Sequence, residues 1–516
     1  MSAAALQLPR LNARLIESNP ALASELSVRS PSELPERVLQ FGEGNFLRAF
    51  VDFMLDQMNR RKLFGGRAVV VQPIAAGMAE AINEQNGLYT VLLRGLESGE
   101  VRESQRIVSS LSRCLNPYQE FDAFLECAKN PDLRFVVSNT TEAGIRSDAD
   151  DRLDARPSVS YPGKLTQFLF ARFQKFGVDP ARGLVLLPCE LIEKNGENLK
   201  RTVFETAERW NLPAEFRRFL SECCIFTNTL VDRIVTGYPK KEAERLSERL
   251  GYEDRLLVTG EIFHSWVIEG PSTLERELPL RETGLNVTWT DDVTPYRERK
   301  VRILNGAHTM LALAAFLSGK DTVRESMQDP LFSSYVTHGI DDEILPTLKL
   351  PRQELLDFAR AVVERFNNPF IEHELLSISL NSVSKYKARL LGTVLDHVRE
   401  RHALPVRLCF ALAALIAFYR GREIRDGALI GARNGRDYAI KDDPAVLEFF
   451  LSAWAKTDFD LSRASCNALV QDVLGRTDFW DSDLNQTVPG FSGQVAEQLH
   501  FISSLGVKGA LQRIAG

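Results

Sequence analysis

The feature that most constrains the fold is a set of four short apolar runs in the first half of the chain. They occupy residues 37–42, 67–74, 133–140 and 183–191, and amphipathic segments separate them. Near-continuous apolar strands that alternate with helical segments are typical of a parallel sheet covered on both faces. The pattern therefore predicts an α/β domain, which we place at residues 1–290.

The second half of the chain has a different pattern, because such runs disappear after about residue 295. Apolar residues there recur with helical spacing, which predicts an all-helical domain over residues 291–516. The predicted helices cover residues 299–317, 353–366, 374–398, 405–420, 444–456 and 461–474. Two polar stretches, 147–160 and 421–443, are rich in charged and turn residues and are expected to be surface loops.

Composition excludes several classes of protein. A chain of 516 residues with 44% hydrophobic residues has the composition of an ordinary globular protein. Its net charge of −6 provides no basic surface for a nucleic acid or an anionic membrane. The longest apolar run, Leu408 to Tyr419, is too short to span a membrane and predicts a buried helix. Arg10 and Arg14 interrupt the N-terminus, which lacks the apolar core of a secretory signal.

The 7 cysteines show no CxxC spacing, and no His/Cys cluster resembles a zinc site. We therefore expect free buried thiols, a reducing cytoplasmic location and no bound metal.

A glycine-containing turn follows the first predicted strand and precedes a helix. Two glycines at this place let the chain turn tightly and let backbone N–H groups approach a diphosphate. The third glycine of the usual G-x-G-x-x-G is replaced by Leu47. The turn is therefore either a cofactor site or a simple strand–helix connection. Its candidate cofactor-binding residues are Phe41, Gly42, Glu43, Gly44, Asn45, Phe46 and Arg48.

Later strand ends offer further polar groups, because ligands of open α/β sheets lie at the carboxyl ends of the strands. Ser138, Asn139 and Thr140 follow the third run and suit a ribose or a nicotinamide, although a helix-capping turn would use the same residues. The second run ends in Gln72 rather than in the acid that binds the adenosine ribose of NAD. The nearby Arg60, Arg61 and Arg67 could accept the 2′-phosphate of NADP or be solvated, so these residues leave the choice of cofactor open.

The strongest chemical signal opens the helical domain. At 100° per residue, Lys300, His308 and Asn305 lie at about 0°, 80° and 140° on a helical wheel. One face thus offers an ammonium, an imidazole and an amide. A lysine can act as a general acid/base when burial or a like charge, here Arg302 or His308, lowers its pKa. The amide and imidazole can donate hydrogen bonds to an oxygen that becomes negative. A surface lysine beside a core-capping Asn and His is the alternative.

Two further polar features are candidates for substrate contacts. Asp232 stands beside an arginine in an apolar segment, where it is either structural or a partner for a substrate hydroxyl. Lys385, Lys387 and Arg389 form a basic cluster that suits an anionic small molecule, although a solvated helix face has the same composition.

With these residues in view, the sequence resembles the mannitol dehydrogenase family of polyol-specific long-chain dehydrogenases, and in particular its uronate-reducing branch. The resemblance runs from about Glu36 to about Trp454. It rests on the motifs FGEGNFLRAFVD (41–52), SNTTEAGI (138–145), LPCELIEKNG (187–196), TLVDRIVTGYP (229–239), PYRERKVRILNGAHT (295–309) and RFNNPFIEHELLSISLNSVSKYKAR (365–389).

The resemblance implies a Rossmann-type domain that binds NAD, a helical substrate domain and hydride transfer without a metal. The family's catalytic lysine falls on Lys300, and its oxygen-binding Asn and His fall on Asn305 and His308. A substrate-contacting Asp falls on Asp232 and a substrate lysine on Lys385. The family also has a tendency toward monomers.

Two departures from the mannitol enzymes bear on the substrate. Leu191 stands where those enzymes carry an Asn, and Ser377 stands where they carry an Arg. Both changes favour a hexuronate, whose carboxylate needs a cation such as Lys385, Arg389 or His373. The leading hypothesis is NADH-dependent reduction of a keto-hexuronate, tagaturonate to altronate. The alternatives are fructuronate reduction, mannitol oxidation and, in a different class, a sugar-acid sensor without catalysis.

Overall fold

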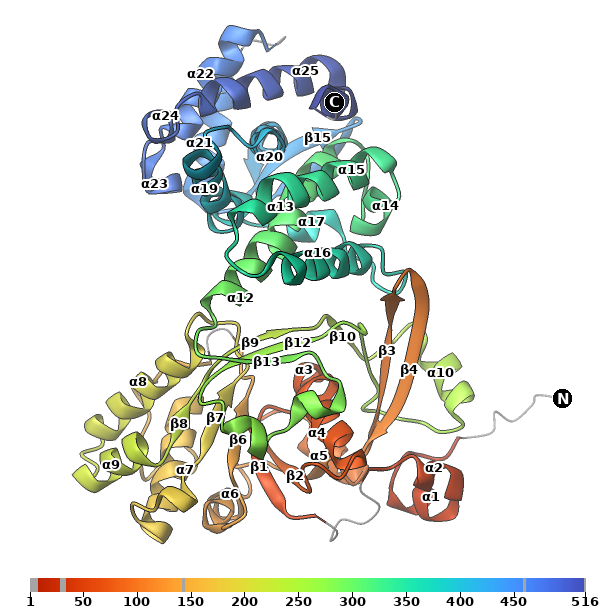
Figure 1. The fold of residues 1–516 in the computed structure, drawn as a ribbon, viewed down its shortest axis with the longest axis vertical. Helices are drawn as coiled ribbons and strands as arrows, with labels where there is room; N and C mark the ends of the chain where they lie inside the picture. The colour runs from red at the N-terminus through yellow and green to blue at the C-terminus, as the bar shows by residue number, and fades with distance from the viewer. Residues whose placement is uncertain (1–7, 28–33, 142–143, 458–460, 515–516) are drawn as a thin grey trace, which may run out of the picture. The chain divides into compact units, whose positions relative to one another are not determined.

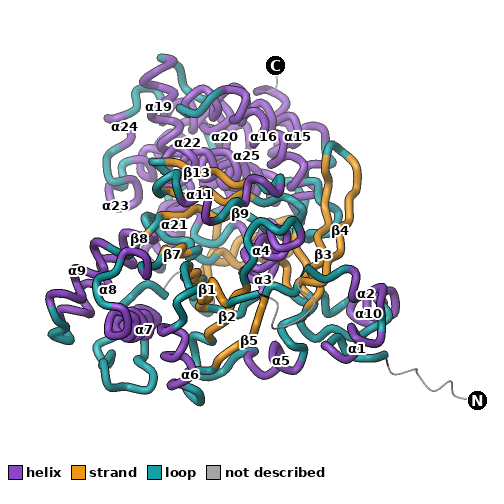
Figure 2. Tube along the Cα trace, turned by 60° about the horizontal axis from the view of Figure 1, so that its bottom comes forward, coloured by secondary structure: helices purple, strands orange, loops and turns teal. Residues whose placement is uncertain are grey.

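The structure, a computed structural model, describes residues 8–27, 34–141, 144–457 and 461–514. It divides into two compact units. Unit 1 comprises Met1–Gly95 and Val101–Val293, and unit 2 comprises Leu96–Glu100 and Thr294–Gly516. Most of the strands lie in unit 1, as the orange segments show (Figure 2).

A six-stranded sheet forms the centre of unit 1. Its strand order is β5-β2-β1-β6-β7-β8, and every neighbouring pair is parallel. The strands are β1 (Glu36–Phe41), β2 (Arg67–Val71), β5 (Leu111–Leu115), β6 (Phe135–Ser138), β7 (Val185–Pro188) and β8 (Ile225–Phe226). The chain builds outward from β1 to one edge and then returns to build outward from β6. This is the doubly wound Rossmann order, and it puts the topological switch point between β1 and β6. The predicted Rossmann-type fold is thus confirmed, and each of the four apolar runs is a strand.

Helices cover both faces of this sheet, because side chains alternate along each strand. Val38 and Val70 face one core, and Leu39 and Val71 face the other. The first core receives α3 (Asn45–Ala49), α4 (Val51–Arg60) and α5 (Ala79–Glu84). The second receives α6 (Phe121–Glu126), α7 (Tyr161–Phe176), α8 (Asn195–Arg209) and α9 (Ala214–Glu222) (Figure 1).

Two smaller sheets complete unit 1. One has the order β10-β11-β3-β4, and the other has the order β13-β12-β9. Their strands are β3 (Tyr89–Glu97), β4 (Glu100–Val108), β9 (Asn228–Asp232), β10 (Val235–Gly237), β11 (Val258–Gly260), β12 (Ser265–Glu269) and β13 (Val287–Thr290). Val91, Val231 and Trp266 from these sheets extend the first core.

Unit 2 consists mainly of helices. The longer ones are α13 (Gly306–Leu317), α15 (Pro330–His338), α16 (Arg352–Phe366), α19 (Gly392–Arg401), α20 (Val406–Phe418), α21 (Pro444–Ala455), α22 (Arg463–Leu474) and α25 (Phe491–Ile514). The apolar run predicted to be a buried helix is α20, which is buried along most of its length. Among the described residues, no helix is both long and apolar enough to cross a membrane.

The segment 421–443 is not the surface loop that we predicted. It folds into a three-stranded antiparallel sheet of β14 (Gly421–Arg425), β15 (Ala428–Arg433) and β16 (Arg436–Ile440). Its turns are Asp426-Gly427 and Asn434-Gly435, and all four residues have φ between 51° and 75°. Two successive left-handed residues make the turn that suits a tight hairpin, so these pairs were strand signals rather than loop signals.

The predicted helix 374–398 is also wrong as one element. It comprises α17 (Leu375–Ile378), α18 (Ser382–Tyr386), the π-helical η7 (Lys387–Leu391) and α19. Asn381 interrupts it with φ 53°, a conformation that an α-helix does not contain.

Candidate functional site

The turn after β1 lies at the switch point of the sheet. Gly42 has φ 115°, and a Cβ on it would meet the Asn139 carbonyl oxygen at 2.9 Å, so only glycine fits. Gly42 N donates to Val71 O at 3.1 Å, and Asn139 N donates to Phe41 O at 3.1 Å. These bonds join the carboxyl ends of β1, β2 and β6, the place where open α/β sheets bind their ligands.

Within the turn, only part of the predicted set is accessible. Gly44 and Asn45 are exposed, and a Cβ on Gly44 would meet nothing within 4 Å, so a ligand can approach the backbone there. Phe46 is half-buried against Phe50, with ring centres 4.9 Å apart. Glu43 is buried, and burial raises the pKa of its carboxyl.

Phe41 and Arg48 are placed as structural residues. The Phe41 ring is fully buried against Tyr161, 4.9 Å between ring centres. The Arg48 guanidinium is buried and donates to Glu43 O at 3.2 Å and to Asn45 Oδ1 at 2.7 Å. Arg48 therefore holds the shape of the turn, and Phe41 contributes its backbone.

Ser138, Asn139 and Thr140 meet a carboxylate from the next strand. Glu190, just beyond β7, accepts from Ser138 Oγ at 3.0 Å, from Thr140 N at 3.0 Å and from Thr140 Oγ1 at 2.9 Å. Asn139 Nδ2 donates to Cys189 O at 2.7 Å. Burial raises the pKa of Glu190. We call Gly42, Ser138, Asn139, Thr140 and Glu190 the strand-end network. Sequence reasoning did not single out Glu190, although it belongs to the motif at 187–196.

The three arginines considered for a 2′-phosphate lie at the other end of the sheet. Arg67 is the first residue of β2, and Arg60 ends the helix that precedes this strand. Arg60 pairs with Asp56 at 2.8 Å, and Arg61 donates to Glu282 O at 2.8 Å. Because the cofactor end of a parallel sheet is its carboxyl end, these arginines cannot serve that role.

Lys300 and Asn305 bound a π-helix in unit 2. The segment η4 (Lys300–Asn305) lies between α12 (Thr294–Arg299) and α13. A π-helix closes each turn with i→i+5 bonds, so residues five apart stand one above the other. The α-helical wheel therefore overstated the angle between Lys300 and Asn305. Arg302, a like charge considered for Lys300, pairs with Asp396 at 2.5 Å.

His308 lies in a cage of aromatic and positive groups. Its ring stacks on Phe366 at 4.2 Å between ring centres and meets the edge of His373 at 4.9 Å. Burial lowers the pKa of His308 well below its ordinary value, and neighbouring basic groups lower it further. These are His373, whose own pKa burial also lowers, and Arg365, Arg389 and Lys385. His308 is consequently neutral at physiological pH and can donate one N–H.

A close backbone approach brings these cations together. A Cβ on Gly306 would meet Leu390 Cδ2 at 3.1 Å, so glycine lets α13 pack against η7. Arg389 Nη1 then reaches Thr309 Oγ1 at 3.2 Å. Burial and the charge of Arg389 lower the pKa of Lys385, although Asp442 opposes this effect. We call His308, Arg365, His373, Lys385 and Arg389 the cationic cluster. Arg365 and Phe366 were missed, although both belong to the motif at 365–389.

Asp232 belongs to unit 1. It ends β9, is 7% exposed and pairs in register with Ser265 of β12. The neighbouring Arg233 is buried and donates to the Ala49 carbonyl at 2.6 Å. Arg233 therefore ties this strand end to the helix after the glycine turn.

Neither unit holds a metal site within its described residues, where no group of three or more His, Cys, Asp or Glu could bind an ion. All 7 cysteines are free and buried, as expected.

Family models cover most of the chain. The model described as the mannitol dehydrogenase Rossmann domain matches residues 36–282, and the model of the mannitol dehydrogenase C-terminal domain matches residues 292–503.

Curated relatives and solved structures extend the match. An altronate oxidoreductase of Pectobacterium atrosepticum is 48% identical over 93% of this chain and 96% of its own length. One of Klebsiella pneumoniae is 47% identical over 93% and 97%. The fold is similar to a substrate-free D-sorbitol dehydrogenase, with TM-score 0.76 and 22% identity over 93% of this chain and 96% of that one. It is also similar to the Pseudomonas fluorescens mannitol 2-dehydrogenase in complex with NAD and D-mannitol, with TM-score 0.67 and 23% identity over 98% and 99%.

Proposed function

Because the chain belongs to the mannitol dehydrogenase family, we propose that it uses NADH to reduce the keto group of a hexuronate, with tagaturonate and altronate as the substrate pair. The observation that carries the substrate class is the cationic cluster, in which Arg365, Lys385 and Arg389 place positive charge around His308. A carboxylate is the natural partner of such a cluster, and hydrogen bonds between charged groups are the stronger kind.

NAD(H) fits the strand-end network. The exposed Gly44 has open space where a Cβ would stand, so a diphosphate can approach the backbone N–H groups of the turn. Asn45 lies beside Gly44, and Phe46 shields the start of the helix. Ser138, Asn139 and Thr140 would hold the far end of the cofactor, with Glu190 fixing their loop. When bound, NADH supplies the hydride and leaves as NAD⁺.

Three side chains of unit 2 would handle the substrate oxygen. Lys300 gives a proton to the carbonyl oxygen as the carbonyl carbon gains hydride, and it takes this proton back in the reverse direction. Asn305 and neutral His308 donate hydrogen bonds to the same oxygen while it carries negative charge. A neutral His308 suits this role because it keeps its N–H without competing for the proton of Lys300.

The remaining predicted contacts concern the rest of the sugar. Lys385 and His373 would bind the carboxylate, and Asp232 would accept a hydrogen bond from a hydroxyl group. A carboxylate at this place would also compensate the charge that lowers the pKa of Lys385. Free thiols in every cysteine position support a reducing compartment, and we propose a cytoplasmic monomer. Sedimentation of the purified chain tests the oligomeric state.

The test is a screen of NADH oxidation with tagaturonate, fructuronate and fructose, repeated with NADPH. We expect turnover with tagaturonate and NADH. A preference for fructuronate would move the chain to another uronate reductase, and a preference for fructose would contradict the role of the cationic cluster. Ligand binding without turnover on any of the three would indicate a sensor.

A further inference from the structure

Two loops beyond the strand-end network meet at the edge of the same sheet. β2 and β5 are neighbours there, and Gln72 N donates to Leu115 O at 2.9 Å where the strands end. The Gln72 side chain is buried and donates to Ile74 O at 2.8 Å and Ala75 O at 3.0 Å. It therefore shapes its own loop, and Ile74, two residues beyond Gln72, is left 62% exposed.

Tyr118 follows β5 and is 39% exposed, yet it is held at several points. Its hydroxyl donates to Pro73 O at 3.4 Å, and its backbone N donates to Asn116 Oδ1 at 3.1 Å. The ammonium of Lys164 lies 5.1 Å from the centre of the ring. An exposed aromatic side chain usually loses rotational freedom when it binds a ligand, and a ring that is already fixed avoids that cost.

Lys164 is itself an unusual support, because the chain buries it completely. Its Nζ donates to Val159 O at 2.6 Å, and burial lowers its pKa to about 8 while the charge of Asp151 raises it. Desolvating an ammonium is unfavourable, so its position under the Tyr118 ring needs compensation from that ring and from Asp151.

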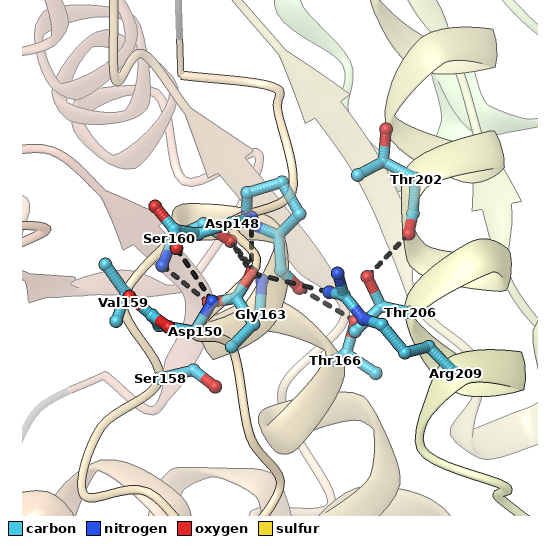
Figure 3. A network of polar contacts seen from close by, with 12 residues as sticks. Asp148, Asp150, Ser158, Val159, Ser160, Gly163, Thr166, Thr202, Thr206 and Arg209 are labelled. Carbon is cyan, nitrogen blue, oxygen red and sulfur yellow. Dashed lines mark hydrogen bonds and ion pairs between the residues drawn. The ribbon is translucent and has the colours of Figure 1, made fainter.

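The loop at 147–160 holds Lys164 in place. Asp151 accepts from Ser160 N at 2.8 Å and from Ser160 Oγ at 2.5 Å, and Arg209 lies 3.8 Å from its carboxylate. Figure 3 shows Ser160 within this loop and Arg209 at the end of the neighbouring helix α8. The segment expected to be only a surface loop is thus anchored to a buried carboxylate beneath the edge of the cofactor site.

We propose that Tyr118 and Ile74 bind the adenine ring of the cofactor, and that Lys164 is a positioning residue that fixes the Tyr118 ring for stacking. This inference rests on the proposed use of NADH. The flat adenine base can stack on the Tyr118 ring, and the Ile74 side chain supplies apolar surface for a second contact with the base. Adenine contacts thereby replace the acid–ribose hydrogen bond that a carboxylate at the end of β2 would make.

Fluorescence titration with NADH and competition by AMP test the proposal on the full chain. We expect Tyr118→Ala to weaken NADH binding about tenfold and to weaken AMP competition equally, because base stacking contributes in this range. Tyr118→Phe keeps the ring and should bind within about twofold of the wild type. Ile74→Ser changes a largely exposed side chain, so it should fold normally and weaken both ligands. Leu395→Ala is the control, since Leu395 is 40% exposed and lies in unit 2.

Lys164→Met separates positioning from general stability. We expect the KM for NADH to rise about threefold while kcat at saturating NADH stays unchanged, as lost cation–π support predicts. If Tyr118→Ala and Ile74→Ser leave the NADH affinity unchanged, the proposed adenine contacts are wrong, but the proposed use of NADH stands. A wild-type chain that fails to bind NADH would overturn the proposed function as well, so the two failures are distinguishable.

Discussion

The strand-end network of unit 1 and the cationic cluster of unit 2 treat charge in opposite ways. In the first, a buried carboxylate, Glu190, accepts three hydrogen bonds from its own chain. In the second, Arg365, Lys385 and Arg389 place positive charge around the buried His308. The first region thus satisfies its carboxylate from within, whereas we expect the second to attract an anion. Cofactor binding should therefore depend on shape, and substrate binding should depend on charge.

The largest expected effect is on chemistry in unit 2. Lys300→Ala should lower kcat by about 10²- to 10⁴-fold, because it removes the proton donor, while NADH affinity stays unchanged. Pre-steady-state and steady-state rates of NADH oxidation measure the change. Lys349→Ala, at an exposed position in the same unit, is the control. Near-normal kcat across the pH range would refute the role of Lys300.

Asn305→Ala should have the next largest effect, a fall in kcat of about 10²- to 10³-fold with little change in KM, as for other donors to a developing oxyanion. Asn305→Asp provides a second variant of similar size.

If His308 acts beside Asn305 as a neutral donor, the pH–rate profile should show no ionisation of His308 between about pH 6 and 8, since the pKa of His308 is lowered. A histidine-like step in that range that His308→Gln removes would contradict the assignment.

Beneath the glycine turn, Asp52 provides a test of stability. Burial raises the pKa of its carboxyl to about 7, and Gln40 Oε1 and Asp52 Oδ1 have no hydrogen-bond partner among the described residues. A pKa raised on folding means that the native state binds the proton more tightly, so stability falls as pH rises from about 4 to about 7. The wild type should lose about 3 kcal/mol more than Asp52→Asn between pH 5 and 8, measured by urea unfolding. Equal losses in both proteins would mean that folding does not raise the pKa of Asp52.

The smallest expected effect lies in the strand-end network. Glu190→Gln keeps the shape but weakens the bonds to Ser138 and Thr140, so the KM for NADH should rise about three- to tenfold with kcat nearly unchanged. Initial rates at varied NADH measure this split. A fall in kcat without a change in KM would mean that Glu190 acts on chemistry rather than on cofactor binding.

Part of the fold and of the candidate site was predictable from the sequence. The four strands and the glycine turn follow from apolar runs and one spacing, which are local signals. The hairpins at Asp426-Gly427 and Asn434-Gly435 also had a local signal, which the charge of the segment obscured. The π-helix at Lys300 and the effect of Arg365 on His308 had no local signal. Both depend on packing between segments that are far apart in the sequence.

The most direct test of the account compares two ketoses that differ mainly by a carboxylate, tagaturonate and tagatose. The wild type should prefer tagaturonate in kcat/KM by about 100-fold, and Lys385→Met should reduce this preference by about tenfold. Lys387→Met is the matched control, since Lys387 pairs with Asp481 at 2.7 Å and should leave the preference unchanged. A wild type that reduces both sugars equally, or a preference that survives Lys385→Met intact, would contradict recognition of the substrate by the cationic cluster.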